Sequence, residues 1–124
     1  MLHHLSIAVS DLDRSSAFYD AVLSAMGYVR VWTQGDAIGY GVPGGDDRFA
    51  IKHRSDHVHV PGDGFHIAFA APSRAAVKNF YNAALKQGGK DNGAPGLRPA
   101  YGEHYFAAFV IDPDGYRIEA TIDD

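Results

Sequence analysis

Histidine is the residue type in this chain best suited to chemistry. The chain has 124 residues, seven histidines and no cysteine. Neutral imidazole is the usual protein ligand for transition metals. The lack of cysteine excludes disulfides, cysteine-based zinc sites and thiol nucleophiles. Metal binding through histidine is therefore the chemistry that the composition favours.

Glu119 is a carboxylate in the middle of a predicted strand. Residues 112–115 read Asp-Pro-Asp-Gly, a strong signal for a tight turn. Residues 116–122 then alternate apolar and polar side chains, which predicts a half-buried strand. Glu119 shares its face with Arg117 and Thr121. This face is consistent with the lining of a polar cavity, although a solvated face is the simpler interpretation of this strand alone.

The remaining elements follow from periodicity, capping residues and turn signals. A helix is expected from Asp11 or Asp13 to Gly27, and a second from Ser73 to about Gln87. The predicted strands cover residues 2–9, 28–33, 37–42, 48–53, 65–71, 104–111 and 116–122. Residues 90–98 are rich in glycine and proline and are expected to form at most a short strand. Residues 55–64 resemble a linker.

The two halves of the chain form a repeat. His4 and His66 lie 62 positions apart, which is half of the chain. At the same offset Phe18-Tyr19 matches Phe80-Tyr81, and three further positions match: Ala21 with Ala83, Leu23 with Leu85 and Gly27 with Gly89. Six matches at one offset indicate a duplicated module of strand, helix and three strands.

The first strand of each module has one bulky face and one small face. The odd-numbered residues of residues 5–9 and 65–69 are bulky and can bury against a helix. The opposite face carries His4 or His66, followed by small residues. Such a face leaves room beside it. We therefore expect an α+β fold in which two βαβββ modules form a cupped, barrel-like mixed sheet with the helices outside, and in which His4, His66 and Glu119 point inward.

Composition limits the partners of the chain. The net charge of −4 and the pI of about 5.9 give no general attraction to nucleic acid or to an anionic membrane. No stretch approaches the length of a membrane span, and no signal peptide is expected because the N-terminus enters a strand pattern at once. We therefore expect a cytoplasmic protein whose partners are neither nucleic acid nor a membrane.

Three segments carry a resemblance to a known family. They are residues 4–15 (His-Leu-Ser-Ile-Ala-Val-Ser-Asp-Leu-Asp-Arg-Ser) leading to Phe18-Tyr19, residues 65–69 (Phe-His-Ile-Ala-Phe), and residues 112–119 (Asp-Pro-Asp-Gly-Tyr-Arg-Ile-Glu). Together they resemble the vicinal oxygen chelate superfamily, which includes glyoxalase I, fosfomycin-resistance proteins, extradiol dioxygenases and bleomycin-binding proteins. The resemblance implies one domain over residues 1–124, with module one at 1–54, a linker at 55–64 and module two at 65–124.

The resemblance also implies a metal site. Members with metal place ligands on the first and last strand of each module, which assigns His4, His66 and Glu119 as ligands. An alignment of the two modules places Ile51 at the fourth position, beside Lys52, and neither residue is a plausible ligand. Two imidazoles and one carboxylate suit a divalent ion (Fe, Mn, Ni or Zn) and leave about three octahedral positions open for a substrate with adjacent oxygens.

Two functions follow from the resemblance. The first is a metal-dependent lyase, isomerase or dioxygenase that acts on a small substrate with vicinal oxygens. The missing fourth ligand argues against lactoylglutathione lyase activity, and Phe109 stands where extradiol enzymes carry an acid/base tyrosine. The alternative is a metal-free protein that binds or sequesters a small molecule, as bleomycin-binding relatives do. Chains of this length in the family commonly dimerise, so a homodimer is expected.

Other residues are secondary candidates for the site. Tyr101, His104 and Tyr105 are candidates for a proton-transfer group, subject to geometry. Trp32, Tyr40 and Phe49 are candidates for the cavity wall, and ordinary sheet packing explains them equally well. Arg54 and Arg98 are possible ligands for an anionic substrate. His53, His57 and His59 form a second, weaker metal-binding possibility.

Overall fold

The chain folds as an α+β protein built from two modules with the same element order. The structure is a computed structural model, and it describes residues 1–54 and 58–124. Module one consists of β1 (Leu5–Val9), α1 (Leu12–Ser24), β2 (Val29–Gln34), β3 (Ala37–Gly41) and β4 (Phe49–His53). Module two consists of β5 (Ile67–Ala70), α2 (Arg74–Lys86), β6 (Lys90–Leu97), β7 (Tyr105–Ile111) and β8 (Arg117–Asp123). The predicted duplication of a βαβββ unit is confirmed.

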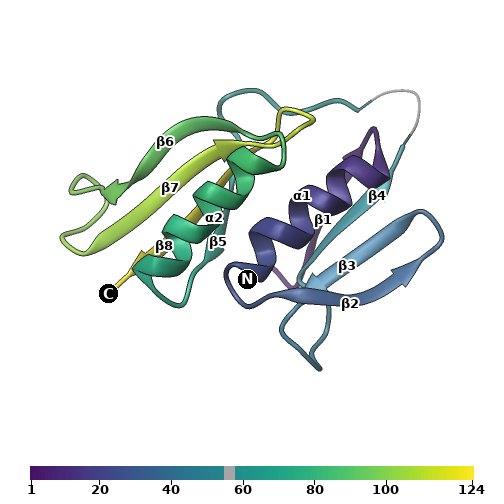
Figure 1. Cartoon of the computed structure of the whole chain (residues 1–124), viewed down its shortest axis with the longest axis horizontal. Helices are drawn as coiled ribbons and strands as arrows, with labels where there is room; N and C mark the ends of the chain where they lie inside the picture. The colour runs from purple at the N-terminus through teal and green to yellow at the C-terminus, as the bar shows by residue number, and fades with distance from the viewer. Residues whose placement is uncertain (55–57) are drawn as a thin grey trace.

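Each module forms its own four-stranded mixed sheet. The strand orders are β1-β4-β3-β2 in sheet A and β5-β8-β7-β6 in sheet B. The first and last strands of each module pair in parallel, and the other neighbours are antiparallel. Both helices cover the same side of the two sheets and lie beside each other (Figure 1). The sheets do not close into a barrel, and the arrangement agrees with a cupped sheet.

The two helices begin and end as their sequences predict. The side chain of Asp11 accepts a hydrogen bond from the backbone N–H of Arg14 at 3.0 Å, and Ser73 Oγ accepts one from Ala76 N–H at 3.0 Å. These caps satisfy N–H groups that have no partner inside the helix. Gly27 and Gly88 follow the helices with positive φ angles of 89° and 88°. Glycine adopts this left-handed conformation without steric cost.

The core lies between the helices and the sheet faces that they cover. Phe18 and Val22 of α1 and Phe80 of α2 are fully buried there, together with the apolar residues of the strands. The rings of Phe49 in β4 and Phe69 in β5 contact each other edge to face, with centroids 5.2 Å apart. Aromatic contacts of this kind add to the area that is buried. The two modules therefore share one core.

The turn at residues 112–115 also joins the modules. Asp112 Oδ1 accepts hydrogen bonds from the N–H groups of Asp114, Gly115 and Tyr116, each at 2.9 Å. Its Oδ2 accepts one from the hydroxyl of Tyr19 in α1 at 2.5 Å. Burial raises the pKa of Asp112. Asp114 forms an ion pair with Arg14 at 3.0 Å. The turn therefore connects β8 to the helix of module one.

One strand is longer than predicted. β6 has eight residues, although residues 90–98 were expected to form a short strand at most. Its pairing with β7 is interrupted twice by register shifts. β6 lies at the edge of sheet B, where proline and bulges are tolerated because one side needs no partner. The glycine-rich composition therefore marks an irregular edge strand.

Part of the predicted linker can be described. Val58 and Val60 pack against the shared core, as does Phe65. Residues 55–57 lie outside the described residues, so the predicted role of His57 does too. Among the residues that the structure describes, no helix is long and apolar enough to cross a membrane.

Candidate functional site

Strand register places the candidate residues of module two on the face of sheet B that carries no helix. Glu119 of β8 pairs with Ala68 of β5 on one side and with Phe109 of β7 on the other. Tyr105 lies on the same face of β7, four residues before Phe109. His66 immediately precedes β5. We call this surface the open face of sheet B. The prediction that Glu119 lies on the face opposite the core residues of its strand is confirmed.

Glu119 is the most enclosed charged group of the chain that the structure describes. Only 2% of its surface is exposed, and it accepts a hydrogen bond from the hydroxyl of Tyr105, with 2.5 Å between that oxygen and Oε2. Its Oε1 lies 3.0 Å from Nε2 of His66. A buried carboxylate needs such partners because removal of a charge from water is unfavourable. The imidazole of His66 is half exposed, so the pair is open to solvent on the histidine side.

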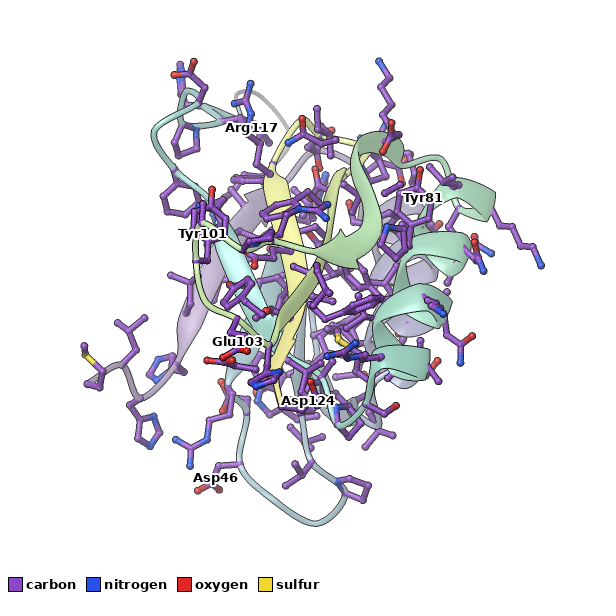
Figure 2. All side chains as sticks on the ribbon, turned by 90° about the vertical axis from the view of Figure 1, so that its left-hand side faces the viewer. Asp46, Tyr81, Tyr101, Glu103, Arg117 and Asp124 are labelled. Atoms are coloured by element: carbon purple, nitrogen blue, oxygen red, sulfur yellow. The ribbon has the colours of Figure 1, made fainter. Side chains whose placement is uncertain are left out.

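Tyr105 is the candidate proton-transfer group that contacts the carboxylate. Burial and the hydrogen bond to Glu119 raise the pKa of its phenol. The hydroxyl therefore remains a donor at neutral pH. The ring of Tyr101 contacts the ring of Tyr105 edge to face, with centroids 5.5 Å apart, and is 66% exposed. Figure 2 shows Tyr101 and Arg117 on the side of the sheet away from α2, and Tyr81 on the side of that helix.

His104 lies apart from this group. Its Nε2 is 3.9 Å from Glu103 Oε2, and both side chains are largely exposed. The structure gives it no contact with Glu119 or His66. Of the three sequence candidates, Tyr105 thus touches the carboxylate directly, Tyr101 touches Tyr105, and His104 touches neither.

The structure does not bring His4 to His66 and Glu119 within one chain. His4 is exposed at the start of β1, and its Nδ1 lies 2.9 Å from Nδ1 of His3. Across residues 1–54 and 58–124, no three histidine, aspartate or glutamate side chains are close enough together to hold a metal ion. One chain therefore supplies His66 and Glu119 as a pair.

The position in module one equivalent to Glu119 is Ala50, and the alignment to Ile51 was wrong. Ile51 pairs with Ile7, faces the helix side and is fully buried in the core. Ala50 pairs with Ser6, just as Glu119 pairs with Ala68. The alignment missed this by one residue, and a shift of one residue reverses the face of a strand. Alanine has no metal-binding atom, so module one offers no carboxylate at this position.

The three aromatic residues predicted for the cavity wall lie on two different faces. Trp32 covers Gly39, where an added Cβ would come within 2.3 Å of the indole ring. Gly39 pairs with Ala50, so Trp32 belongs to the helix-free face of sheet A. Tyr40 and Phe49 pair with each other, face the core and are buried. The Tyr40 hydroxyl donates to Asp20 at 2.8 Å.

A cavity of about 280 Å³ lies between the modules, and Glu119 is not among the residues that line it. Its apolar wall is formed by Tyr40 and Phe49 of module one and by Ile67 and Phe69 of module two. His3, His4 and Arg48 also line it. Sequence reasoning missed Tyr28, which lines the same cavity and donates a hydrogen bond to Ala70 O at 2.6 Å. The sequence signal that could have identified Tyr28 as a lining residue is its position as an aromatic residue directly after Gly27, which ends the helix.

Comparisons with known proteins agree with this architecture. The family model described as "Glyoxalase/Bleomycin resistance protein/Dioxygenase superfamily" matches residues 1–120. No curated protein sequence matches the chain. A glyoxalase/bleomycin resistance protein from Albidiferax ferrireducens T118 is 31% identical, covers 95% of both chains and superposes with a TM-score of 0.82.

Two further solved structures extend the likeness. A putative glyoxalase from Bacillus halodurans is 25% identical over 98% of this chain and 94% of its own, with a TM-score of 0.72. A glyoxalase I mutant from Zea mays is 20% identical over 97% of this chain and 45% of its own, with a TM-score of 0.73, and shows a likeness of fold alone. The match of the family model over nearly the whole chain and the Albidiferax structure lead to one conclusion: the chain belongs to the glyoxalase/bleomycin resistance protein/dioxygenase superfamily.

Proposed function

We propose that this protein is a metal-dependent enzyme of the glyoxalase or dioxygenase type that acts on a small substrate with vicinal oxygens, as a lyase, an isomerase or a dioxygenase. The membership of the superfamily supports an enzymatic or ligand-binding function. The observation that carries the proposal is the buried carboxylate of Glu119, held beside the half-exposed imidazole of His66. An imidazole nitrogen and a carboxylate oxygen in contact are the donors that a divalent transition metal prefers.

The third ligand in this proposal is His4 from a second copy of the chain. β1 and β5 are edge strands of their sheets, so within residues 1–54 and 58–124 each has one side without a strand partner. Exposed edges of this kind are templates for pairing with another chain. His4 lies at the start of β1, and His66 lies directly before β5. A homodimer that brings β1 of one chain beside β5 of the other would bring these histidines together.

Each residue of the open face has a role in the proposed reaction. A divalent ion (Fe, Mn, Ni or Zn) would serve as a Lewis acid for the substrate oxygens or as the place where substrate and O₂ meet. His66 and Glu119 would hold that ion. Tyr105 fixes the orientation of the Glu119 carboxylate, because its hydroxyl donates to Oε2 of that group. Phe109 pairs with Glu119 across β7 and β8, and its ring would limit the access of water from that side.

The test is a screen of diols, catechols and thiol adducts with protein that is loaded in turn with Fe²⁺, Mn²⁺, Ni²⁺ or Zn²⁺. Turnover should be abolished in Glu119→Gln, which removes a charged ligand with little change of shape. Glu103→Gln is the matched control because Glu103 is exposed and lies outside the pair. Turnover that persists in Glu119→Gln, or after removal of the metal with a chelator, would contradict the proposal.

The cavity between the modules supports a second function, the metal-free binding of a planar apolar molecule. Its walls are largely apolar and aromatic, as in most small-molecule sites. The probe for this function is the dye 8-anilinonaphthalene-1-sulfonate, added to chelator-treated protein. Dye binding by the wild type that is lost in Ile67→Trp, where the larger side chain fills the cavity, would support the binding function. Equal dye fluorescence in the wild type and the variant would exclude this cavity as the site.

A further inference from the structure

We propose that Arg98 is the residue that selects the substrate: it binds an anionic group, so the substrate is a small planar anion such as an aromatic carboxylate. This inference rests on the proposed function, because it names the substrate class for the same open face. The sequence left two arginines, Arg54 and Arg98, as possible ligands for an anionic substrate. The structure separates them, because Arg54 lies beside Asp36, with 3.5 Å between Nη1 and Oδ2.

Arg98 lies on the same face as Glu119. Its backbone N–H donates to the carbonyl of Tyr105 at 2.8 Å and so continues the pairing of β6 with β7. Residues that pair across antiparallel strands share a face. Tyr105 faces Glu119, and Arg98 therefore faces the same side. The guanidinium carbon lies 5.4 Å from the centroid of Phe109, which in turn pairs with Glu119. The Phe109 ring is also the neighbour of His66, with centroids 6.4 Å apart.

Two glycines of β6 leave space for the guanidinium group of Arg98. A Cβ added at Gly93 would come within 3.3 Å of Nη2, and one added at Gly96 would come within 3.1 Å of Nη1. Both glycines lie in β6, and their lack of a side chain gives the arginine room to lie along the strand. Nη2 donates to the carbonyl of Ala94 at 2.7 Å, and Nη1 lies 3.4 Å from the carbonyl of Leu97. The group is therefore held in position.

The charge of Arg98 has no counter-ion in the described part of the chain. Its two hydrogen-bond acceptors are neutral carbonyl oxygens, and no ion pair among residues 1–54 and 58–124 includes it. A guanidinium has five N–H donors in a planar fork that matches a carboxylate. Arg98 is half buried, which strengthens its attraction for an anion relative to a fully solvated side chain. The remaining donors are available to a ligand.

The ligand class follows from the neighbours of this arginine. The flat ring of Phe109 lies against both Arg98 and His66, and the rings of Tyr101 and Tyr105 lie beside the same face. A planar ring fits among them. An aromatic ligand with a carboxylate near Arg98 and adjacent oxygens near Glu119 would satisfy both ends of the site.

Three probes separate the two ends. Catechol carries vicinal oxygens without a charge, benzoate carries a carboxylate without vicinal oxygens, and 3,4-dihydroxybenzoate carries both. Their dissociation constants are measured by isothermal titration calorimetry with Zn²⁺-loaded protein, because zinc does not oxidise catechols. We expect 3,4-dihydroxybenzoate to bind at least about tenfold more tightly than catechol, because its carboxylate forms a charge-assisted hydrogen bond with Arg98 that catechol lacks.

The variants are Arg98→Gln, Arg98→Lys and a matched control, Arg74→Gln. Arg74 also stacks on an aromatic ring of β7, 5.1 Å from the centroid of Phe106, but on the helix side of the sheet. Arg98→Gln should abolish the preference for 3,4-dihydroxybenzoate, Arg98→Lys should retain part of it, and Arg74→Gln should leave it unchanged. A preference that survives in Arg98→Gln, or falls equally in Arg74→Gln, would overturn the assignment.

The probes also distinguish this inference from the proposed function. Equal binding of catechol and 3,4-dihydroxybenzoate, both lost in Glu119→Gln, would leave the proposed function standing and overturn the role of Arg98. In a second outcome, benzoate and 3,4-dihydroxybenzoate bind equally, catechol does not bind, and Arg98→Gln loses both bound ligands. This result would support the role of Arg98 and contradict the vicinal-oxygen function. No binding of any probe would overturn both.

Discussion

At the scale of single residues, the hydrogen bond from Tyr105 to Glu119 is the contact whose removal is most informative. Tyr105→Phe deletes the donor and leaves one oxygen of a buried carboxylate without it. We expect the free energy of unfolding of the metal-free protein to fall by about 1–3 kcal/mol, as measured by urea denaturation. Tyr101→Phe is the control, because that side chain is largely exposed. An equal loss in both variants would show that the Tyr105 hydroxyl has no specific role.

Sequence reasoning predicted the positions of some residues of the candidate site and failed at others for identifiable reasons. His66 and Glu119 were predicted to lie opposite the bulky residues of their strands, and the structure joins them at 3.0 Å. Their role as metal ligands stays a prediction. The assignment of Ile51 to the position of Glu119 was wrong because the alignment of the two modules was one residue out of register. The hydrogen bond from Tyr105 to Glu119 joins two different strands, and no local sequence pattern predicts a contact between residues that far apart in the chain.

At the scale of elements, the tie between α1 and the turn before β8 is the contact that should matter most for stability. The Tyr19 hydroxyl donates to Asp112 inside the core, and burial beside this carboxylate raises the pKa of Tyr19 well above its usual range. Tyr19→Phe should lower the free energy of unfolding by about 1–2 kcal/mol. Tyr81, the repeat equivalent of Tyr19 on α2, is half exposed, and Tyr81→Phe should cost less than about 0.5 kcal/mol. Equal losses in urea denaturation would contradict a special role for the turn.

The pKa of Asp112 predicts how this tie depends on pH. Burial raises the pKa of Asp112 above its ordinary value of 3.8, so the folded chain binds this proton more tightly than the unfolded chain. The contribution of the group to stability is therefore fully present below pH 3.8 and is lost as the pH rises through the raised pKa.

Denaturation curves of the wild type and of Asp112→Asn between pH 3 and pH 7 measure this dependence. The stability of the wild type relative to the variant should decline as the pH rises. The exposed substitution Asp63→Asn controls for the loss of one negative charge. A constant difference between wild type and Asp112→Asn over this range would contradict the prediction.

The elements themselves were largely accessible to sequence reasoning. Helix caps at Asp11 and Ser73, the glycines after each helix and the strand alternation all act locally, and the structure follows them. β6 was underestimated because glycine and proline lower the strand propensity of residues 90–97. Pairing with β7 at the edge of the sheet overrides that propensity. A propensity cannot reveal such a neighbour.

At the scale of the whole molecule, β1 and β5 each have an edge with no strand partner in the described part of the chain, and these edges predict a homodimer with sites that combine two chains. Sedimentation at micromolar concentration should show a dimer. His4→Ala and His66→Ala chains are mixed, unfolded and refolded together, so that mixed dimers form. Each mixed dimer then contains one intact site, with His4 from the His66→Ala chain and with His66 and Glu119 from the His4→Ala chain. Metal binding should therefore return in part, although each variant alone lacks it.

A site formed within one chain gives the opposite result. Each variant would then lack one ligand in every site, and mixing the two chains would restore no metal binding. A protein that sediments only as a monomer would also contradict the shared site. The repeat in the sequence predicted two modules, but it held no information on whether the modules that form a site come from one chain or from two.

The measurement that tests the account most directly is the metal content of the protein, purified without chelators or a histidine tag. Inductively coupled plasma mass spectrometry of the wild type should find close to one divalent metal ion per chain. The metal should be lost in His4→Ala and in Glu119→Ala and retained in the control His104→Ala, whose side chain is exposed beside Glu103. Equal metal content in Glu119→Ala, or no uptake by the wild type of added Fe²⁺, Mn²⁺, Ni²⁺ or Zn²⁺, would contradict the account.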